Sequence, residues 1–254
     1  MIISHKHKYL FVELPRTGST AIRRELRQQY DGVPILFKHA TYYDFQRIAS
    51  QKEKEYFVFS GIRNPLDEAV SLYFKYKTDH EARFSESRKI EKNRLVRSLA
   101  LKKFNFIKDH NADFPTYFMK HYWRPYNSWS SLSHKDFDFV IRFENLSQDF
   151  AQALQLIGLE PKRPLPVVNR TGARKENYLS YYSPEIQSRA SRVFGPYMQQ
   201  WGYEFPPQWN HQPVPWWNQL EFSLWSQAGL LYWKYIRPRL HARPQKASTL
   251  LHPG

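Results

Sequence analysis

Cysteine is absent from the 254-residue sequence, and its absence excludes several kinds of chemistry. A disulfide framework, a cysteine-ligated zinc site, an iron–sulfur cluster and a thiol nucleophile all require it. The ten histidines form no His-Glu-x-x-His pattern and no compact cluster with acidic residues, so the sequence predicts no catalytic metal. It also contains no apolar run of about 20 residues, and residues 1–9 lack the apolar segment of an export signal. We therefore expect a soluble, cytoplasmic protein.

Acidic side chains are scarce relative to basic ones. The sequence has 38 Lys and Arg against 23 Asp and Glu, which gives a formal net charge of +15 and a pI near 9.8. Such an excess predicts attraction to an anionic partner: nucleic acid, a phosphorylated small molecule, an acidic polysaccharide or a membrane surface. The length fits one domain with or without an appendage.

Short apolar segments alternate with helical patterns along the chain. Strands are predicted at 9–14, 56–62 and 137–143, with a further strand at 35–40. Helices are predicted from Thr20, with Ser19 or Thr20 as the N-cap, from Pro65 with Asn64 as the N-cap, over 147–156 with Gly158 as the stop, and from Pro184. This alternation predicts an α/β fold with a central parallel sheet and helices on both faces. Ligands of such sheets bind at the carboxyl ends of the strands.

The loop after the first predicted strand has the composition of an oxyanion site. Pro15-Arg16-Thr17-Gly18-Ser19-Thr20 brings backbone amides, hydroxyls and a helix N-terminus to one point, which suits phosphate or sulfate. It is not a Walker A loop, because it lacks the Gly-Lys-Ser/Thr ending. A structural turn with a capping hydroxyl is the alternative interpretation.

The loop after the second predicted strand places Arg63 at a strand end and Ser71 two turns into the next helix. Both side chains could reach a second phosphate, Arg63 through bidentate charge-assisted bonds. Alternatively, Arg63 is a solvated charge and Ser71 bonds to its own helix backbone.

These two loops resemble the motifs of sulfotransferases that use 3'-phosphoadenylyl sulfate. Residues 15–20 resemble their 5'-phosphosulfate loop, and Arg63-Asn64-Pro65-Leu66-Asp67 through Ser71 and Tyr73 resembles their 3'-phosphate motif. The resemblance spans residues 8–206 and continues in these segments: 139–146, Asn169-Arg170-Thr171 with Arg174 and Tyr178, and Gly202-Tyr203. The carbohydrate sulfotransferases related to the heparan sulfate 2-O and 6-O enzymes look most similar. The resemblance implies a P-loop-like three-layer fold.

The resemblance also implies roles for individual residues. Thr17, Gly18, Ser19 and Thr20 would bind the 5' end of the donor, Arg63 and Ser71 the 3'-phosphate, and Arg170, Thr171 and Arg174 would close over the nucleotide. Arg16 stands where many relatives carry Lys; since arginine does not deprotonate, its expected catalytic role is electrostatic.

His39, at the end of the strand predicted over 35–40, resembles the histidine found at a similar place in related enzymes, and its pKa suits a general base. The alternative is a histidine without chemistry. Asp44 and Glu13 are reserve candidates for the base.

Two segments differ from the rest of the chain. Residues 83–110 carry nine Lys and Arg against three Asp and Glu, and we interpret them as a basic helical insertion within a sulfotransferase domain of residues 1–206. This insertion is either a solvated helix face or a binding surface for an acidic glycan. Residues 207–254 form a basic extension with five of the eight tryptophans. The extension either packs over the domain or touches anionic lipid as an interfacial helix.

The predicted function is transfer of a sulfuryl group from 3'-phosphoadenylyl sulfate to a hydroxyl acceptor, with a carbohydrate or acidic glycan as the expected acceptor and no metal. A kinase that uses ATP and magnesium is an alternative, although the Gly-Lys-Ser/Thr element is missing. A nucleic-acid-binding module is a second alternative, supported only by composition. We expect no nucleic acid partner.

Overall fold

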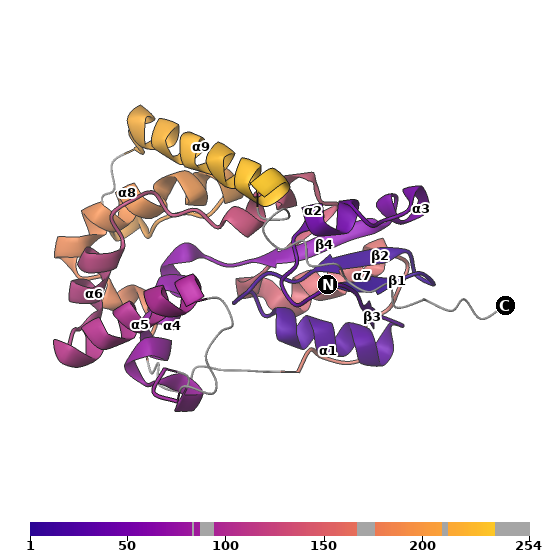
Figure 1. The fold of residues 1–254 in the computed structure, drawn as a ribbon, viewed down its shortest axis with the longest axis horizontal. Helices are drawn as coiled ribbons and strands as arrows, with labels where there is room; N and C mark the ends of the chain where they lie inside the picture. Colours follow the sequence, from indigo (N-terminus) through magenta and orange to yellow (C-terminus); the bar gives the residue numbers. More distant parts are fainter. Residues whose placement is uncertain (83, 87–93, 167–175, 210–212, 237–254) are drawn as a thin grey trace.

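The computed structural model describes residues 1–82, 84–86, 94–166, 176–209 and 213–236. A five-stranded sheet carries helices on both faces, and a lobe of further helices lies beyond one end of the sheet (Figure 1).

The sheet is mixed rather than wholly parallel. Its strand order is β3 (Val33–Pro34), β1 (Ile2–Ser4), β2 (Tyr9–Val12), β4 (Phe57–Ile62) and β5 (Phe139–Arg142). The pairs β2–β4 and β4–β5 are parallel, whereas β1 is antiparallel to both β2 and β3. The connection from β1 to β2 is too short for the crossover that a parallel pair requires. The chain therefore reverses direction between the two strands, and they pair antiparallel. The expectation of a parallel sheet is therefore correct for β2, β4 and β5 and wrong for the N-terminal edge.

Three of the four predicted strands are confirmed as β2, β4 and β5, each shorter than its apolar run. The strand predicted at 35–40 is wrong. Strand β3 ends at Pro34, which has no N–H to continue a ladder. Beyond it, Leu36 and His39 take left-handed conformations, with φ of 55° and 63°, that no strand accommodates.

Alternating side chains of β2 define the two faces of the sheet. Tyr9 and Phe11 pack with α1 (Ser19–Gln29) and α7 (Leu146–Leu156) on one face. Leu10 and Val12 pack on the other face with Phe45 of α2 (Tyr42–Gln46), which is followed by α3 (Gln51–Lys54). The predicted helices on both faces are confirmed (Figure 1). The interior is aromatic, which accounts for much of the unusual Tyr and Phe content.

The helical lobe is formed by α4 (Pro65–Lys77), α5 (Arg94–Asp109), α6 (Phe114–His121) and α8 (Pro184–Trp201). Tyr73, Phe114, Tyr117, Phe118 and Phe194 form the centre of its core. The basic segment predicted to be helical provides α5, while its residues 83 and 87–93 lie outside the described ranges.

The described part of the C-terminal extension packs against the domain. Helix α9 (Trp216–Leu231) lies along α8 at the outside of the lobe and buries Asn218, Phe222 and Ser226 (Figure 1). A π-helical turn, η7 (Tyr232–Ile236), follows. Within the described ranges, no helix is long and apolar enough to cross a membrane.

Candidate functional site

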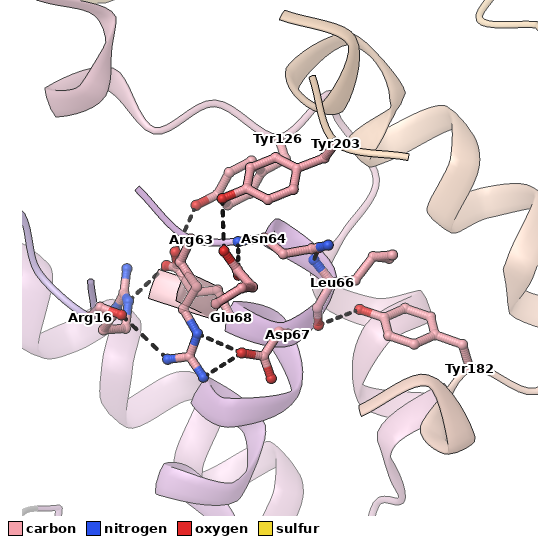
Figure 2. Close-up of polar contacts among 10 residues, drawn as sticks. Arg16, Arg63, Asn64, Leu66, Asp67, Glu68, Tyr126, Tyr182 and Tyr203 are labelled. Carbon is pink, nitrogen blue, oxygen red and sulfur yellow. Dashed lines mark hydrogen bonds and ion pairs between the residues drawn. The ribbon is translucent and has the colours of Figure 1, made fainter. Parts of the chain in front are cut away.

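Two loops meet at the carboxyl ends of neighbouring parallel strands. Residues 13–18 leave β2 and residues 63–64 leave β4, and the β2–β4 register aligns Val12 with Ser60. Nη1 of Arg63 donates to the backbone oxygen of Arg16 at 3.3 Å, so the second loop holds the first directly (Figure 2). Both predicted phosphate-binding loops therefore lie at one edge of the sheet.

The first loop has an unusual backbone. Arg16 and Gly18 both take left-handed conformations, with φ of 67° and 73°, and such a conformation is costly for arginine. Thr17 is buried and its hydroxyl donates to the backbone oxygen of Leu14 at 2.9 Å. A side chain at Gly18 would collide with Leu146, because its Cβ would lie 2.7 Å from a Leu146 methyl. The loop is therefore held in one shape by backbone and packing together.

The N-terminus of α1 differs from its sequence prediction. The N-cap is Gly18, not Ser19 or Thr20, and no side chain caps the helix. Ser19 is buried and Thr20 is half-buried in the first turn. Because the first N–H groups of a helix have no partner within it, this uncapped end can bind an oxyanion with backbone amides.

Arg16 is held by an acidic side chain of α4. Its Nε donates to Oε1 of Glu68 at 2.7 Å, and the other oxygen of Glu68 accepts from the hydroxyl of Tyr126 at 3.1 Å (Figure 2). The Glu68 carboxylate raises the pKa of Arg16 further above its ordinary value, so the guanidinium is permanently charged. Among the described residues, the terminal nitrogens of Arg16 have no hydrogen-bond partner. They are available to an anion.

Arg63 is buried and bound on several sides. Nε and Nη2 both contact Oδ2 of Asp67, at 2.8 and 2.7 Å, and the guanidinium stacks on Phe143 at 4.1 Å from the ring centroid. Only 8% of Arg63 is exposed. Each terminal nitrogen still has a second N–H for a ligand. The solvated-charge interpretation of Arg63 is wrong, because this arginine connects the two loops.

The helix that follows Arg63 begins as predicted. Oδ1 of Asn64 accepts from the N–H of Leu66 at 2.9 Å and caps α4. The N–H of Asn64 donates to Glu144, whose second oxygen accepts from the hydroxyl of Tyr203 at 3.0 Å. Ser71 lies eight residues after Arg63, on the same side of α4 as Asp67, and is buried.

His39 lies in a turn instead of at a strand end. Its Nδ1 is 3.1 Å from the backbone oxygen of Glu13, the residue directly after β2. A carbonyl oxygen only accepts, so Nδ1 carries the proton and Nε2 is left with a free lone pair. Partial burial lowers the pKa of His39 below its ordinary value of 6.5, which keeps the ring neutral at pH 7. These are the properties of a general base, and the Glu13 contact ties the ring to the edge where Arg16 lies.

Other predicted candidates are placed less favourably or not at all. Arg170, Thr171 and Arg174 lie outside the described residues, as do all of 167–175. Asp44 caps α2 with its carboxylate, which accepts from the N–H of Thr41 at 2.8 Å. Glu13 binds Arg23 through its buried carboxylate, at 2.7 Å. Both reserve bases thus have structural roles.

A cavity of about 340 Å³ opens beside Arg16. One wall comes from α4 with Glu68 and Leu72, and a second from α5 with Lys103. The third wall comes from the last residue of α6 and the chain that follows it: His121, Tyr122, Trp123, Arg124 and Tyr126. The sequence did not identify these wall residues, except that Lys103 falls in the basic insertion. These residues are far apart in the sequence, and no local sequence pattern predicts that they line one cavity.

Two titratable groups in the cavity wall have lowered pKa values. Burial, followed by the charges of Lys103 and Lys120, lowers the pKa of His121 to about 4, and its Nε2 has no partner among the described residues. Burial, followed by the charge of Arg16, lowers the pKa of Lys103. Within the described ranges, no three His, Asp or Glu side chains are grouped as metal ligands.

Comparison with known proteins identifies the family of the chain. No curated protein and no solved structure matches the chain. Residues 1–203 match the family described as the sulfotransferase family. The matched residues include both loops, the whole sheet and most of the helical lobe. This protein therefore belongs to the sulfotransferase family, whose enzymes transfer sulfate.

Proposed function

We propose that the protein transfers a sulfuryl group from 3'-phosphoadenylyl sulfate to a hydroxyl of a carbohydrate. The observation that carries this proposal is the hydrogen bond from Arg63 to the backbone of Arg16, which joins two anion-binding loops at one edge of the sheet. A donor nucleotide with charge at both its 5' and 3' ends needs two such loops at a fixed separation. The mostly parallel sheet beneath them is consistent with a P-loop-like fold.

The donor would lie across these loops. The uncapped end of α1 and residues 17–20 would bind the 5'-phosphosulfate through backbone N–H groups and hydroxyls. The unused N–H groups of Arg63, with Ser71, would bind the 3'-phosphate. The proposed donor site also includes Arg170, Thr171 and Arg174, which would close over the nucleotide.

The reaction is an in-line transfer. The acceptor oxygen forms a bond to sulfur while the bond between sulfur and the bridging oxygen of the 5'-phosphate breaks, and 3',5'-adenosine bisphosphate leaves. Charge builds on the bridging oxygen, where the terminal nitrogens of Arg16 would stabilise it. Because Arg16 stays protonated, its contribution is electrostatic and the leaving phosphate departs as the anion.

The acceptor hydroxyl loses its proton as the new bond forms. Nε2 of His39 is the proposed base, since Nδ1 is engaged with the Glu13 carbonyl and the ring is neutral at pH 7. That contact sets both the tautomer and the orientation of the ring.

The cavity beside Arg16 is the proposed acceptor site. Tyr122, Trp123 and Tyr126 give it aromatic walls that suit the apolar faces of a sugar ring, and its polar groups suit hydroxyls. This composition supports a carbohydrate acceptor.

Calorimetry with 3',5'-adenosine bisphosphate tests the donor half of the proposal. We expect the wild-type protein to bind it and Arg63→Ala to bind at least tenfold more weakly, because a charge-assisted bond to phosphate contributes about 1.5–3 kcal/mol. Arg27→Ala is the matched control, since Arg27 is an exposed arginine in the last turn of α1. Absence of binding by the wild type, or equal binding by all three proteins, contradicts the assignment. A thermal melt of each variant separates lost binding from lost folding.

A further inference from the structure

The acceptor cavity is positively charged. Three cationic side chains border it, Arg16, Lys103 and Arg124, against one carboxylate, Glu68, which leaves an excess of two positive charges. Glu68 is already bound to Arg16. Within the described part of the chain, neither Lys103 nor Arg124 has an ion pair. Both cations can therefore bind an anion that enters the cavity.

Arg124 is held between two indole rings. Its guanidinium lies 4.1 Å from the ring centroid of Trp123 and 4.6 Å from that of Trp225. Guanidinium stacking on aromatic faces is favourable and leaves the N–H groups at the rim free to donate. The stacking restricts an otherwise flexible side chain, so less entropy is lost when a ligand binds.

Trp225 comes from the C-terminal extension, beyond the residues that match the sulfotransferase family. Helix α9 is fixed next to the cavity wall by a second contact, in which Nδ2 of Asn127 donates to the hydroxyl of Ser226 at 2.9 Å. Asn218 at the start of α9 donates to the backbone of Arg192 in α8 at 3.2 Å. The extension therefore reaches the cavity in a defined position.

We propose that α9 takes part in acceptor recognition: Arg124 and Lys103 bind a carboxylate or sulfate group already present on the carbohydrate acceptor, and Trp225 is a positioning residue that holds Arg124 for this contact. This inference rests on the proposed function, because it assigns the chemistry of the acceptor in the same site. The negative group would lie between these two cations while the sugar ring contacts the aromatic wall. It would also compensate the repulsion from Arg16 that, after burial, lowers the pKa of Lys103.

Binding of two matched oligosaccharides tests the proposal. One alternates glucuronic acid with N-acetylglucosamine, and the other is its carboxyl-reduced, neutral form. With 3',5'-adenosine bisphosphate present, we expect the full-length protein to bind the acidic form about tenfold more tightly in calorimetry, the effect of one charge-assisted contact. Arg124→Gln and Lys103→Gln should each remove most of this preference without changing the affinity for the nucleotide.

The positioning role of Trp225 needs its own variants. Trp225→Leu should weaken binding of the acidic form severalfold and leave the neutral form unchanged, and Trp225→Phe should restore most of the loss because its ring can still stack. Trp216→Leu is the matched control, since Trp216 is 75% exposed on the same helix. If Trp225→Leu does not fold, Arg124→Gln and Trp225→Phe still decide the question.

The outcomes separate the two proposals. Equal binding of both oligosaccharides by the wild type, binding of neither, or an acidic preference that survives Arg124→Gln overturns the acceptor inference while leaving the donor assignment intact. An effect of Trp216→Leu as large as that of Trp225→Leu overturns the positioning role alone. Failure to bind the nucleotide overturns the proposed function itself.

Discussion

Asp67→Asn is expected to destabilise the protein because it removes the charge that neutralises a buried arginine. The Asp67 carboxylate receives two bonds from Arg63, at 2.8 and 2.7 Å, and the two side chains are 7% and 9% exposed. Removing one partner of a buried ion pair costs about 3–5 kcal/mol, since the other charge is left buried and unpaired. Asparagine still accepts one bond, so we expect about 3 kcal/mol, the lower end of that range.

Urea unfolding and thermal melts at pH 7 measure this effect. In a domain of this size, 1 kcal/mol shifts the melting temperature by about 2–4 °C, so the expected decrease is roughly 6–12 °C. Asp31→Asn is the matched control: Asp31 pairs with Lys6 at 3.2 Å on the surface, where solvent screens the two charges and loss of the pair costs little stability. Saturating 3',5'-adenosine bisphosphate should stabilise Asp67→Asn more than the wild type, because its phosphate supplies the missing anion. A loss below about 1 kcal/mol, or one equal to that of Asp31→Asn, refutes the reasoning.

Three further predictions concern single side chains. Gly18→Ala should destabilise the protein more than Gly158→Ala and should weaken nucleotide binding. Both glycines have φ above 70°, but of the two only Gly18 faces a neighbour, Leu146. Urea titration and calorimetry of the two variants check this, and equal losses of stability count against it. His39→Ala should lower kcat by about 10²–10⁴-fold with unchanged nucleotide affinity. The wild-type rate should be level above pH 6.5 and fall in more acidic buffer, because the neutral imidazole is lost there. Retained turnover of His39→Ala rejects His39 as the base. Burial lowers the pKa of His134 to about 3, so its neutral form stabilises the fold above pH 6.5 and that stability is lost as pH falls toward 3. His134→Phe, which keeps the stacking on Phe137, should reduce the loss between pH 7 and 4.5 by about 3 kcal/mol in urea titrations, and an unchanged slope contradicts this.

The sequence predicted β2, β4 and β5 because each is a short apolar run with helical periodicity after it. It missed β1 and β3, because strands of three and two residues are too short to leave an alternating pattern in the sequence. The sequence also predicted a strand that includes Ile35 and Phe37, because both side chains are apolar. A strand must pair, and the positive φ of Leu36 and His39 ends any pairing after Pro34.

The site was predictable where its residues are neighbours in sequence. The loop that contains Arg16, and Arg63 with the helix it precedes, are local motifs whose composition points to oxyanions. The partners of these arginines depend on tertiary packing instead: Glu68 is 52 positions from Arg16 along the chain. Trp225 and Arg124 meet only because α9 folds back over the lobe. Local sequence patterns do not predict contacts between distant residues, and for this reason the cavity was not predicted.

Under the proposed function, the hydrogen bond between Arg63 and the backbone of Arg16 also bears on which nucleotide the protein binds. Because the two loops are joined through their own atoms, the separation of the two proposed anion sites is set before any nucleotide binds. The regioisomer 2',5'-adenosine bisphosphate has the same charge and nearly the same size, yet it places its second phosphate on the neighbouring ribose carbon. A protein with loops that adjust independently would bind both isomers alike. Here the loops are tied, and the 2',5' isomer is expected to bind more weakly although every charged group it needs is present.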